Sequence, residues 1–278
     1  MGFNKEFMKL TNGIKMIGFN ALGQMGRLGN QMFQFAALKG IAQNNGYEYC
    51  LPPTRNKNVW TDHQLFNPFK LKNVEEKNIQ FIDVSKPTII ENSFSFDEKL
   101  FNECPDDVSI QGYFQTEKYF KHIRNNILED FEFIDDILEP AKKTISNWKN
   151  PIALHIRRTD YTIDPNHTVL DLSYYEEALK LFDENCEVII FSDEPKWCMD
   201  QKLFESDRFM VSETNDTYMD LCLMTLCSGH IIANSSFSWW GAWLSSNNKV
   251  VAPSGWFSGS NNEHLDTKDI IPETWIVI

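Results

Sequence analysis

Basic side chains follow a short apolar segment in the second half of the chain. Residues 151–154 are Pro-Ile-Ala-Leu, and His155, Arg157, Arg158 and Asp160 come soon after them. An apolar run of this length predicts a buried parallel strand, and open α/β sheets bind ligands at the carboxyl ends of their strands. Two guanidinium groups beside an imidazole suit a diphosphate, because arginine forms paired hydrogen bonds with phosphate oxygens. The alternative is a solvated charge cluster.

A glycine-containing loop in the first half is a second candidate site. Residues 23–31 join a predicted strand to an apolar helical pattern and include Gly26, Gly29, Asn30 and Gln31. Glycines let the backbone turn tightly and approach a ligand closely, and the helix that follows offers unpaired N–H groups. Asn30 and Gln31 add amides that both donate and accept hydrogen bonds. A tight turn without a ligand is the alternative.

Hydroxyl and amide side chains begin a helix near the end of the chain. Asn234, Ser235 and Ser236 follow an apolar strand at 230–233. Such residues favour helix N-caps, and together they also form a candidate phosphate cradle of N–H and O–H donors. Asp220, at the start of an apolar helix, either meets the helix dipole or accepts two N–H bonds from a guanine edge.

Several other chemistries lack the residues they need. The segment 192–195, Ser-Asp-Glu-Pro, is read as a first-turn acidic cap rather than a metal-binding carboxylate pair, and we expect no metal. A G-x-S-x-G turn is absent, which excludes a typical serine hydrolase, and no dinucleotide fingerprint supports an oxidoreductase. The six cysteines form no CxxC pair and are expected to be free thiols. Trp239, Trp240 and Trp243 are expected to pack between domains.

The elements that carry these residues alternate between strand and helix. From Pro151 onward we predict strands at 152–156, 187–191, 209–211, 230–233 and 249–252, and helices at 173–182, 196–204, 216–227 and 236–245. In the first half we predict strands at 15–22, 47–51 and 108–115, extended segments at 80–84 and 88–91, and a helix at 117–129. This alternation predicts an α/β fold with parallel sheets and two facing Rossmann-like domains, 1–150 and 151–278.

Composition limits the partners and the location of the protein. The chain has 278 residues and a formal net charge of −13, which argues against nucleic acid or an anionic membrane as the main partner. Residues 1–15 lack the apolar core of a signal peptide, and no apolar run approaches the ~18 residues of a membrane span. We therefore expect a cytoplasmic protein without a transmembrane segment, which leaves peripheral membrane association open.

The candidate residues lie in blocks that resemble those of a known family. The blocks at 29–36, 111–120, 155–160 and 234–244 are similar to the motifs of the α-1,2-fucosyltransferases of glycosyltransferase family 11, of the bacterial or viral type. The resemblance covers residues 26–244 in the family's order. It implies a GT-B fold, with an acceptor-side first domain and a second domain that binds the GDP-sugar. It also implies inverting transfer from GDP-β-L-fucose to the 2-hydroxyl of a terminal galactose of a glycan, without metal or other cofactor.

The resemblance also implies roles for individual residues. It implies that Arg157 or Arg158 binds the β-phosphate and stabilises its developing charge, while the other arginine orients nearby carboxylates. Asp164 is the first choice for the base, with His167 and Asp160 as nearby alternatives, although some related enzymes use no dedicated base. The predicted catalytic residues are Arg157, Arg158 and Asp164, and the predicted substrate-binding residues are Asn30, Gln31, His155, Asp160, Asp220, Asn234, Ser235 and Ser236.

Two departures and two alternatives accompany this interpretation. Thr159 stands where many members have glycine, and the residues before Lys15 have no counterpart that we can assign. The alternatives are a catalytically silent nucleotide-sugar or glycan-binding protein of the same fold, and a Rossmann oxidoreductase. The residues do not identify the acceptor glycan, whose loops we expect in the irregular region 54–107.

Overall fold

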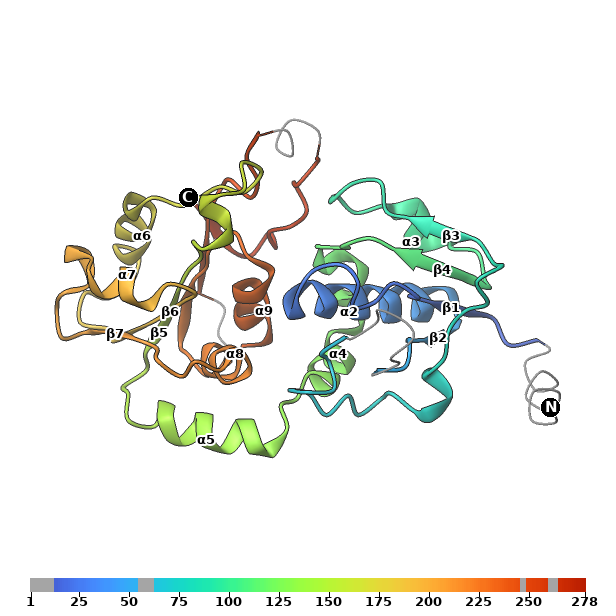
Figure 1. Ribbon diagram of the computed structural model, residues 1–278, viewed down its shortest axis with the longest axis horizontal. Helices are drawn as coiled ribbons and strands as arrows, with labels where there is room; N and C mark the ends of the chain where they lie inside the picture. The colour runs from blue at the N-terminus through green and yellow to red at the C-terminus, as the bar shows by residue number, and fades with distance from the viewer. Residues whose placement is uncertain (1–12, 55–62, 246–248, 260–264) are drawn as a thin grey trace.

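Two parallel β-sheets organise the residues that the structure describes (Figure 1). The structure is a computed structural model that describes residues 13–54, 63–245, 249–259 and 265–278. The first sheet has the order β2-β1-β4-β3, with β1 at Met16–Gly18, β2 at Glu48–Cys50, β3 at Thr88–Ile90 and β4 at Val108–Gln111. The second has the order β10-β9-β8-β5-β6-β7, with β5 at Ile152–Ile156, β6 at Val188–Ser192, β7 at Phe209–Val211, β8 at Gly229–Ile231, β9 at Val250–Ala252 and β10 at Ile276–Val277. The predicted parallel α/β architecture is confirmed.

Helices pack around these sheets and between them. The α-helices of the described residues are α2 at Leu28–Asn45, α3 at Glu98–Glu103, α4 at Arg124–Asp130, α5 at Asp135–Ile145, α6 at Leu172–Leu179, α7 at Pro195–Met199, α8 at Thr217–Thr225 and α9 at Ser236–Leu244. Short 3₁₀ helices lie at Glu76–Asn78 (η1), Glu117–Tyr119 (η2), Lys121–Ile123 (η3), Asp160–Thr162 (η4) and Lys202–Phe204 (η5). None of the described helices is long and apolar enough to cross a bilayer.

The helix α2 is the central helix of the first half. It is buried on nearly all sides from Leu28 to Ala42, because the first sheet covers part of it and α9 with η2 covers another part. A helix buried in this way has no polar face, so its sequence lacks a clear amphipathic stripe. Gly46 ends it in the left-handed conformation, with φ 69°.

Aromatic side chains join the two halves of the molecule, as Figure 1 shows where α9 meets α2. Trp239 and Trp240 lie with ring centres 4.4 and 4.9 Å from that of Phe33 on α2. The Trp240 ring also stacks on Phe120 at 5.4 Å, and Trp243 meets the same ring edge-on at 5.4 Å. The predicted packing of these tryptophans between the halves is confirmed, and all six cysteines are free thiols, as expected.

Some predicted elements of the first half are shorter or broken. The helix predicted at 117–129 is divided into η2, η3 and α4, because Phe120 leaves the helical conformation and packs against the tryptophans of α9. The segment predicted as extended at 80–84 forms no strand. Instead the Asn20 side chain pairs with Ile82: it donates to the Ile82 carbonyl at 2.9 Å and accepts from the Ile82 N–H at 3.0 Å. One side-chain amide thus takes the place of a strand partner.

Candidate active site

A cleft of about 920 Å³ lies between the carboxyl ends of the two sheets. Its walls come from the loops after β1, β5, β6 and β8 and from the first turns of α2, α8 and α9. The predicted residues that line it are Asn30, His155, Arg157, Asp160, Asp220, Ser235 and Ser236. Residues from segments far apart in the sequence therefore meet at one cleft.

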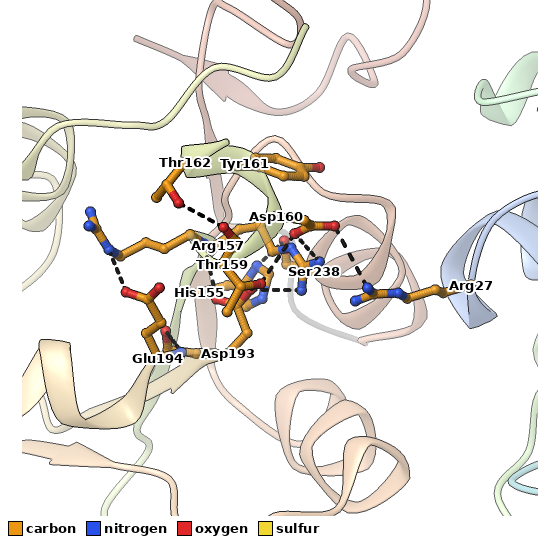
Figure 2. Close-up of polar contacts among 12 residues, drawn as sticks. Arg27, His155, Arg157, Thr159, Asp160, Tyr161, Thr162, Asp193, Glu194 and Ser238 are labelled. Carbon is orange, nitrogen blue, oxygen red and sulfur yellow. Dashed lines mark hydrogen bonds and ion pairs between the residues drawn. The ribbon is translucent and has the colours of Figure 1, made fainter. Parts of the chain in front are cut away.

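Arg157 is a mostly buried cation in the cleft wall. It follows β5, whose residues are all buried, so the strand fixes where the side chain begins. Its Nη2 donates to Asp160 Oδ1 at 2.5 Å, and its Nη1 lies 2.9 Å from Asp193 Oδ2 (Figure 2). Its guanidinium carbon lies 5.4 Å from the centre of the Tyr161 ring. Two carboxylates thus hold the guanidinium in one orientation, which prepares it to meet an anion without reorganisation.

Arg158 has different surroundings and is not among the described residues that line the cleft. Its Nε donates to Glu194 Oε2 at 2.9 Å, and its guanidinium lies 3.9 Å from the centre of the Trp197 ring. Its backbone N–H donates to Asp193 Oδ1 at 3.0 Å. Neighbouring residues of an extended chain point to opposite sides, so only one of the two arginines can face the cleft.

Asp160 connects the two halves of the molecule. One of its oxygens accepts from Arg157, and the other lies 3.8 Å from Nη2 of Arg27, in the glycine loop after β1 (Figure 2). Burial acts to raise the pKa of Asp160, but Arg157 and Arg27 outweigh burial and hold the pKa below its usual range. Asp160 is therefore ionised at neutral pH and is a weak base.

Two helices begin at the cleft with first turns that no side chain caps. In α2 and α9, both fully described, the first turn has neither a side-chain cap nor an acidic residue, whereas Asp216 caps α8. Asn30 lines the cleft at the start of α2, and Ser235 and Ser236 line it at the start of α9. The first turns of α2 and α9 pack closely together, because a Cβ added to Gly29 would lie 2.7 Å from the Ser236 carbonyl carbon. The positive ends of two helix dipoles therefore converge, which favours an anion.

His155 lies at the cleft with only 6% of its surface exposed. Its Nδ1 lies 2.9 Å from Ser238 Oγ, and its ring centre lies 5.7 Å from that of Phe237. Burial lowers the pKa of His155 to about 3. The imidazole is therefore neutral at neutral pH, and it offers a ligand a hydrogen bond rather than a charge.

Asp220 lies in the cleft wall on α8. Its Oδ1 accepts hydrogen bonds from the hydroxyls of Ser212 and Thr214, both at 2.7 Å. Burial raises the pKa of Asp220, and the two hydroxyl donors oppose that rise. No described residue hydrogen-bonds its Oδ2, which can therefore accept an N–H from a ligand.

Gln31 and Asn234 are not among the described residues that line the cleft. Gln31 is buried, and its Oε1 accepts from the backbone N–H of Gln64 at 2.8 Å. Asn234 is also buried, and its amide donates to the carbonyls of Thr168 at 3.0 Å and Trp256 at 2.8 Å. Both side chains hold backbone segments around the cleft in place.

Asp164 also lies outside the described cleft lining, and it contacts a residue that lines it. Its Oδ1 accepts from the backbone N–H of Asn166 at 2.9 Å, and its Oδ2 accepts from Nδ1 of His167 at 2.9 Å. The Asn166 N–H and then His167 outweigh the effect of burial and lower the pKa of Asp164. The ionised carboxylate thus sits behind His167, which faces the cleft.

The reading of Asp193 and Glu194 as a first-turn acidic cap is wrong. Glu194 makes no cap hydrogen bond at α7, and both carboxylates pair with the two arginines instead. The cause is strand register: β5 and β6 are neighbours, with Ile156 opposite Ser192, so the residues after each strand meet. Sequence reasoning could find this pairing only if the strand order were known. Among the described residues, no group of three His, Cys, Asp or Glu side chains could hold a metal ion.

Comparison with known proteins relates this site to one family. The model described as Glycosyl transferase family 11 matches residues 4–278. The O-antigen biosynthesis glycosyltransferase WbnK of Escherichia coli is 30% identical, over 86% of this chain and 95% of that protein. An alpha-1,2-colitosyltransferase of Escherichia coli is 28% identical, over 91% and 96% of the two chains. Galactoside alpha-(1,2)-fucosyltransferase 2 of Bos taurus is 25% identical, over 82% and 69%.

Solved structures share the arrangement of the elements. The fucosyltransferase NodZ from Bradyrhizobium has a TM-score of 0.55 at 12% identity, over 85% of this chain and 95% of that one. POFUT1 in complex with GDP-fucose has a TM-score of 0.50 at 15% identity, over 86% and 96%. These likenesses confirm the expected GT-B fold with its two parallel sheets.

Proposed function

Because this chain belongs to glycosyltransferase family 11, we propose that it transfers L-fucose from GDP-β-L-fucose to the 2-hydroxyl of a terminal galactose in a glycan. The name of the bovine relative specifies this linkage, and POFUT1 was solved with this donor. The transfer inverts the anomeric centre, because the acceptor oxygen attacks opposite the departing GDP. A silent binding protein and an oxidoreductase have no comparable support.

The observation that carries the proposal is the setting of Arg157. It is a cation fixed by two carboxylates, in a cleft where the uncapped starts of α2 and α9 also converge. As GDP leaves, negative charge grows on its β-phosphate. A fixed guanidinium stabilises that charge more in the transition state than in the ground state, which accelerates the transfer. Ser235 and Ser236 add hydroxyl donors for the same phosphates.

We place the nucleotide base against Asp220. Asp220 Oδ2, which no described residue hydrogen-bonds, suits the adjacent N–H groups of a guanine edge, which adenine does not present. His155 adds a neutral hydrogen-bonding group, and Asn30 faces the sugar from the other half of the cleft. Arg158 supports the site indirectly, because it orients Glu194 beside Asp193.

A second candidate is transfer of colitose, since one relative is an alpha-1,2-colitosyltransferase. Colitose is fucose without its 3-hydroxyl, so both donors share the nucleotide and the leaving-group chemistry. A site built to hydrogen-bond a hydroxyl rejects the analogue that lacks it by about 10⁴-fold or more. The preference between GDP-fucose and GDP-colitose therefore distinguishes the two candidates.

The test is transfer to a β-galactoside such as lactose, measured as GDP release and followed by linkage analysis of the product. We expect an α-linked fucose on O2 of galactose, with turnover retained in EDTA because guanidinium groups and helix N-termini supply the positive charge. A product linked elsewhere contradicts the linkage. Stabilisation by GDP without turnover on any galactoside indicates a silent binding protein, and stabilisation by NAD instead of GDP indicates an oxidoreductase.

A further inference from the structure

His167 lines the cleft but has no part in the proposed phosphate site. Its side chain is 29% exposed, and its Nδ1 donates to Asp164 Oδ2 at 2.9 Å. An ionised carboxylate can only accept hydrogen bonds, so this contact places the proton of the neutral ring on Nδ1 and leaves the lone pair on Nε2. No described residue hydrogen-bonds that Nε2.

Neighbouring rings hold the imidazole in one plane. Tyr161 stacks on it with ring centres 4.2 Å apart and an angle of 29°, and Phe257 meets it edge-on at 5.9 Å. The backbones of His167 and Phe257 also form an antiparallel bridge. The Tyr161 hydroxyl donates to the carbonyl of Asn234 at 3.0 Å, which fixes the stacked ring. An imidazole held in this way is pre-organised for proton transfer.

The other candidate bases in the described cleft lining already have partners or are too weakly basic. Asp160 and Asp193 pair with Arg157, and Asp216 accepts from the N–H groups of α8. Asp220 accepts from two hydroxyls through Oδ1, and in the proposed function its Oδ2 is occupied by the nucleotide base. His155 is buried, and its lowered pKa of about 3 makes it a poor proton acceptor. His167 therefore differs from His155 and from these carboxylates, because it presents a basic nitrogen with no described partner to the cleft.

Tyr161 links His167 to Arg157, the proposed stabiliser of the leaving group. Tyr161 has the Arg157 guanidinium carbon 5.4 Å from its ring centre and contacts His167 as well. An inverting transfer needs the stabiliser of the leaving group and the acceptor of the nucleophile's proton to be separated by a sugar. Inverting glycoside hydrolases, which meet the same demand, keep their two groups about 6.5–9.5 Å apart. Because Tyr161 contacts both groups, Arg157 and His167 lie near one another in the cleft.

We propose that His167 accepts the proton of the acceptor hydroxyl and that Asp164 is its positioning residue, an inference that rests on the proposed function. The acceptor oxygen forms a bond to the anomeric carbon while the bond from that carbon to the β-phosphate oxygen breaks, and its electron pair leaves with GDP. The hydroxyl proton moves to Nε2. The imidazolium, stabilised by Asp164, then releases the proton to solvent. Among the described residues, Asp164 and Tyr161 are the titratable groups that contact His167, and Phe257 on the adjoining segment carries no charge.

The experiment compares the wild-type chain with His167→Gln and Asp164→Asn, using GDP-fucose and lactose. A general base typically contributes about 10²–10⁴-fold, so we expect His167→Gln to lower kcat by that factor and to lose the acidic limb of the pH–kcat profile. Asp164→Asn should lower kcat less than His167→Gln, because the imidazole loses only the carboxylate that orients it. Asp171→Asn removes an exposed carboxylate that makes no cap hydrogen bond on α6, and it should change neither quantity.

Further measurements separate catalysis from folding and from acceptor binding. The affinity for GDP should stay within about threefold in both variants, and imidazole should restore part of the kcat of His167→Ala. The proposal is overturned if His167→Gln retains kcat and the acidic limb, or if it raises only the KM for lactose. Absence of transfer by the wild-type chain overturns the fucosyltransferase proposal together with this one, whereas transfer that survives in His167→Gln overturns this one alone.

Discussion

The two halves of the molecule bring different chemistry to one cleft. The second half contributes charged groups, among them Arg157 and Asp160 after β5 and Asp220 on α8. The first half contributes the amide of Asn30, a tyrosine and the exposed Arg27. Fixed charges suit a nucleotide diphosphate, while amides and aromatic rings suit a neutral sugar. Two sheets of the same type therefore support different tasks, because the loops at their ends differ.

The largest effect is expected at Arg157, the cleft cation that the second half contributes. Arg157→Ala should lower kcat by about 10²–10³, the usual loss for one donor to a developing oxyanion. Arg158→Ala is the matched control from the next residue, and it should lower kcat about tenfold less because its guanidinium lies on Trp197 and Glu194. Steady-state kinetics and thermal unfolding of both variants measure this. Equal losses would show that the two arginines share the task.

The second test concerns Glu91, a carboxylate with a structural role in the first half. Glu91 Oε2 accepts from the backbone N–H groups of Tyr113 at 2.7 Å and Phe114 at 2.9 Å. Burial raises the pKa of Glu91 to about 7, against the opposing effect of these two donors. The native state therefore holds a proton that the unfolded chain loses near pH 4.5, and the contribution of Glu91 to stability falls as pH rises from there to about 7.

Glu91→Gln should remove that pH dependence. The gap between the two pKa values corresponds to at most about 3 kcal/mol of unfolding free energy. Urea unfolding of both proteins at pH 5 and pH 8 measures the difference, which should be larger for the wild-type chain. We expect kcat to change little, and a large loss of kcat at unchanged stability would assign Glu91 to the reaction.

Donor recognition should depend on Asp220 more than on its neighbours. Asp220→Asn should weaken GDP binding by about 10–100-fold, because a hydrogen bond to a charged group contributes about 1.5–3 kcal/mol. Asp216→Asn is a suitable control on the same helix, since asparagine also caps helices well. Calorimetric titration with GDP and with ADP tests the assignment. If the preference for GDP persists in Asp220→Asn, the guanine lies elsewhere.

The smallest effect is expected at Arg27. Its side chain is 79% exposed and lies 3.8 Å from Asp160, and exposed ion pairs contribute about 0–1 kcal/mol. Arg27→Ala should therefore change the melting temperature little and kcat/KM by less than about fivefold. A loss as large as that of Arg157→Ala would show that the first half also contributes to the phosphate site, which contradicts the contrast between the halves.

The second half was also the easier one to predict. β5 and β7 have the predicted boundaries, 152–156 and 209–211, because regular alternation leaves a local pattern in the sequence. In the first half, the helix predicted at 117–129 is broken by the packing of Phe120 on Trp240, a residue distant in the chain. Hydrophobic periodicity depends on residues that are close together in the sequence, so it does not predict contacts between distant residues.

The candidate site shows the same limit. Adjacent arginines after a strand must point to opposite sides, but the side that faces the cleft depends on the order of the strands. Only with β6 placed beside β5 do Asp193 and Glu194 become the partners of the arginines. The sequence indicates His167 only weakly as a base for a similar reason. The proposed role depends on its contact with Asp164 and on the stacked Tyr161 ring, which sequence patterns do not show.

The tryptophans of α9 have a consequence for how the chain unfolds. Trp239, Trp240 and Trp243 lie in the same continuous apolar cluster as Phe33 and Phe120 of the first half. Detaching one half would expose that cluster to water, so we expect the two halves to unfold together. Scanning calorimetry should therefore record one cooperative transition, with equal van't Hoff and calorimetric enthalpies. The two sheets are separate in geometry, but we expect them to behave as a single thermodynamic unit.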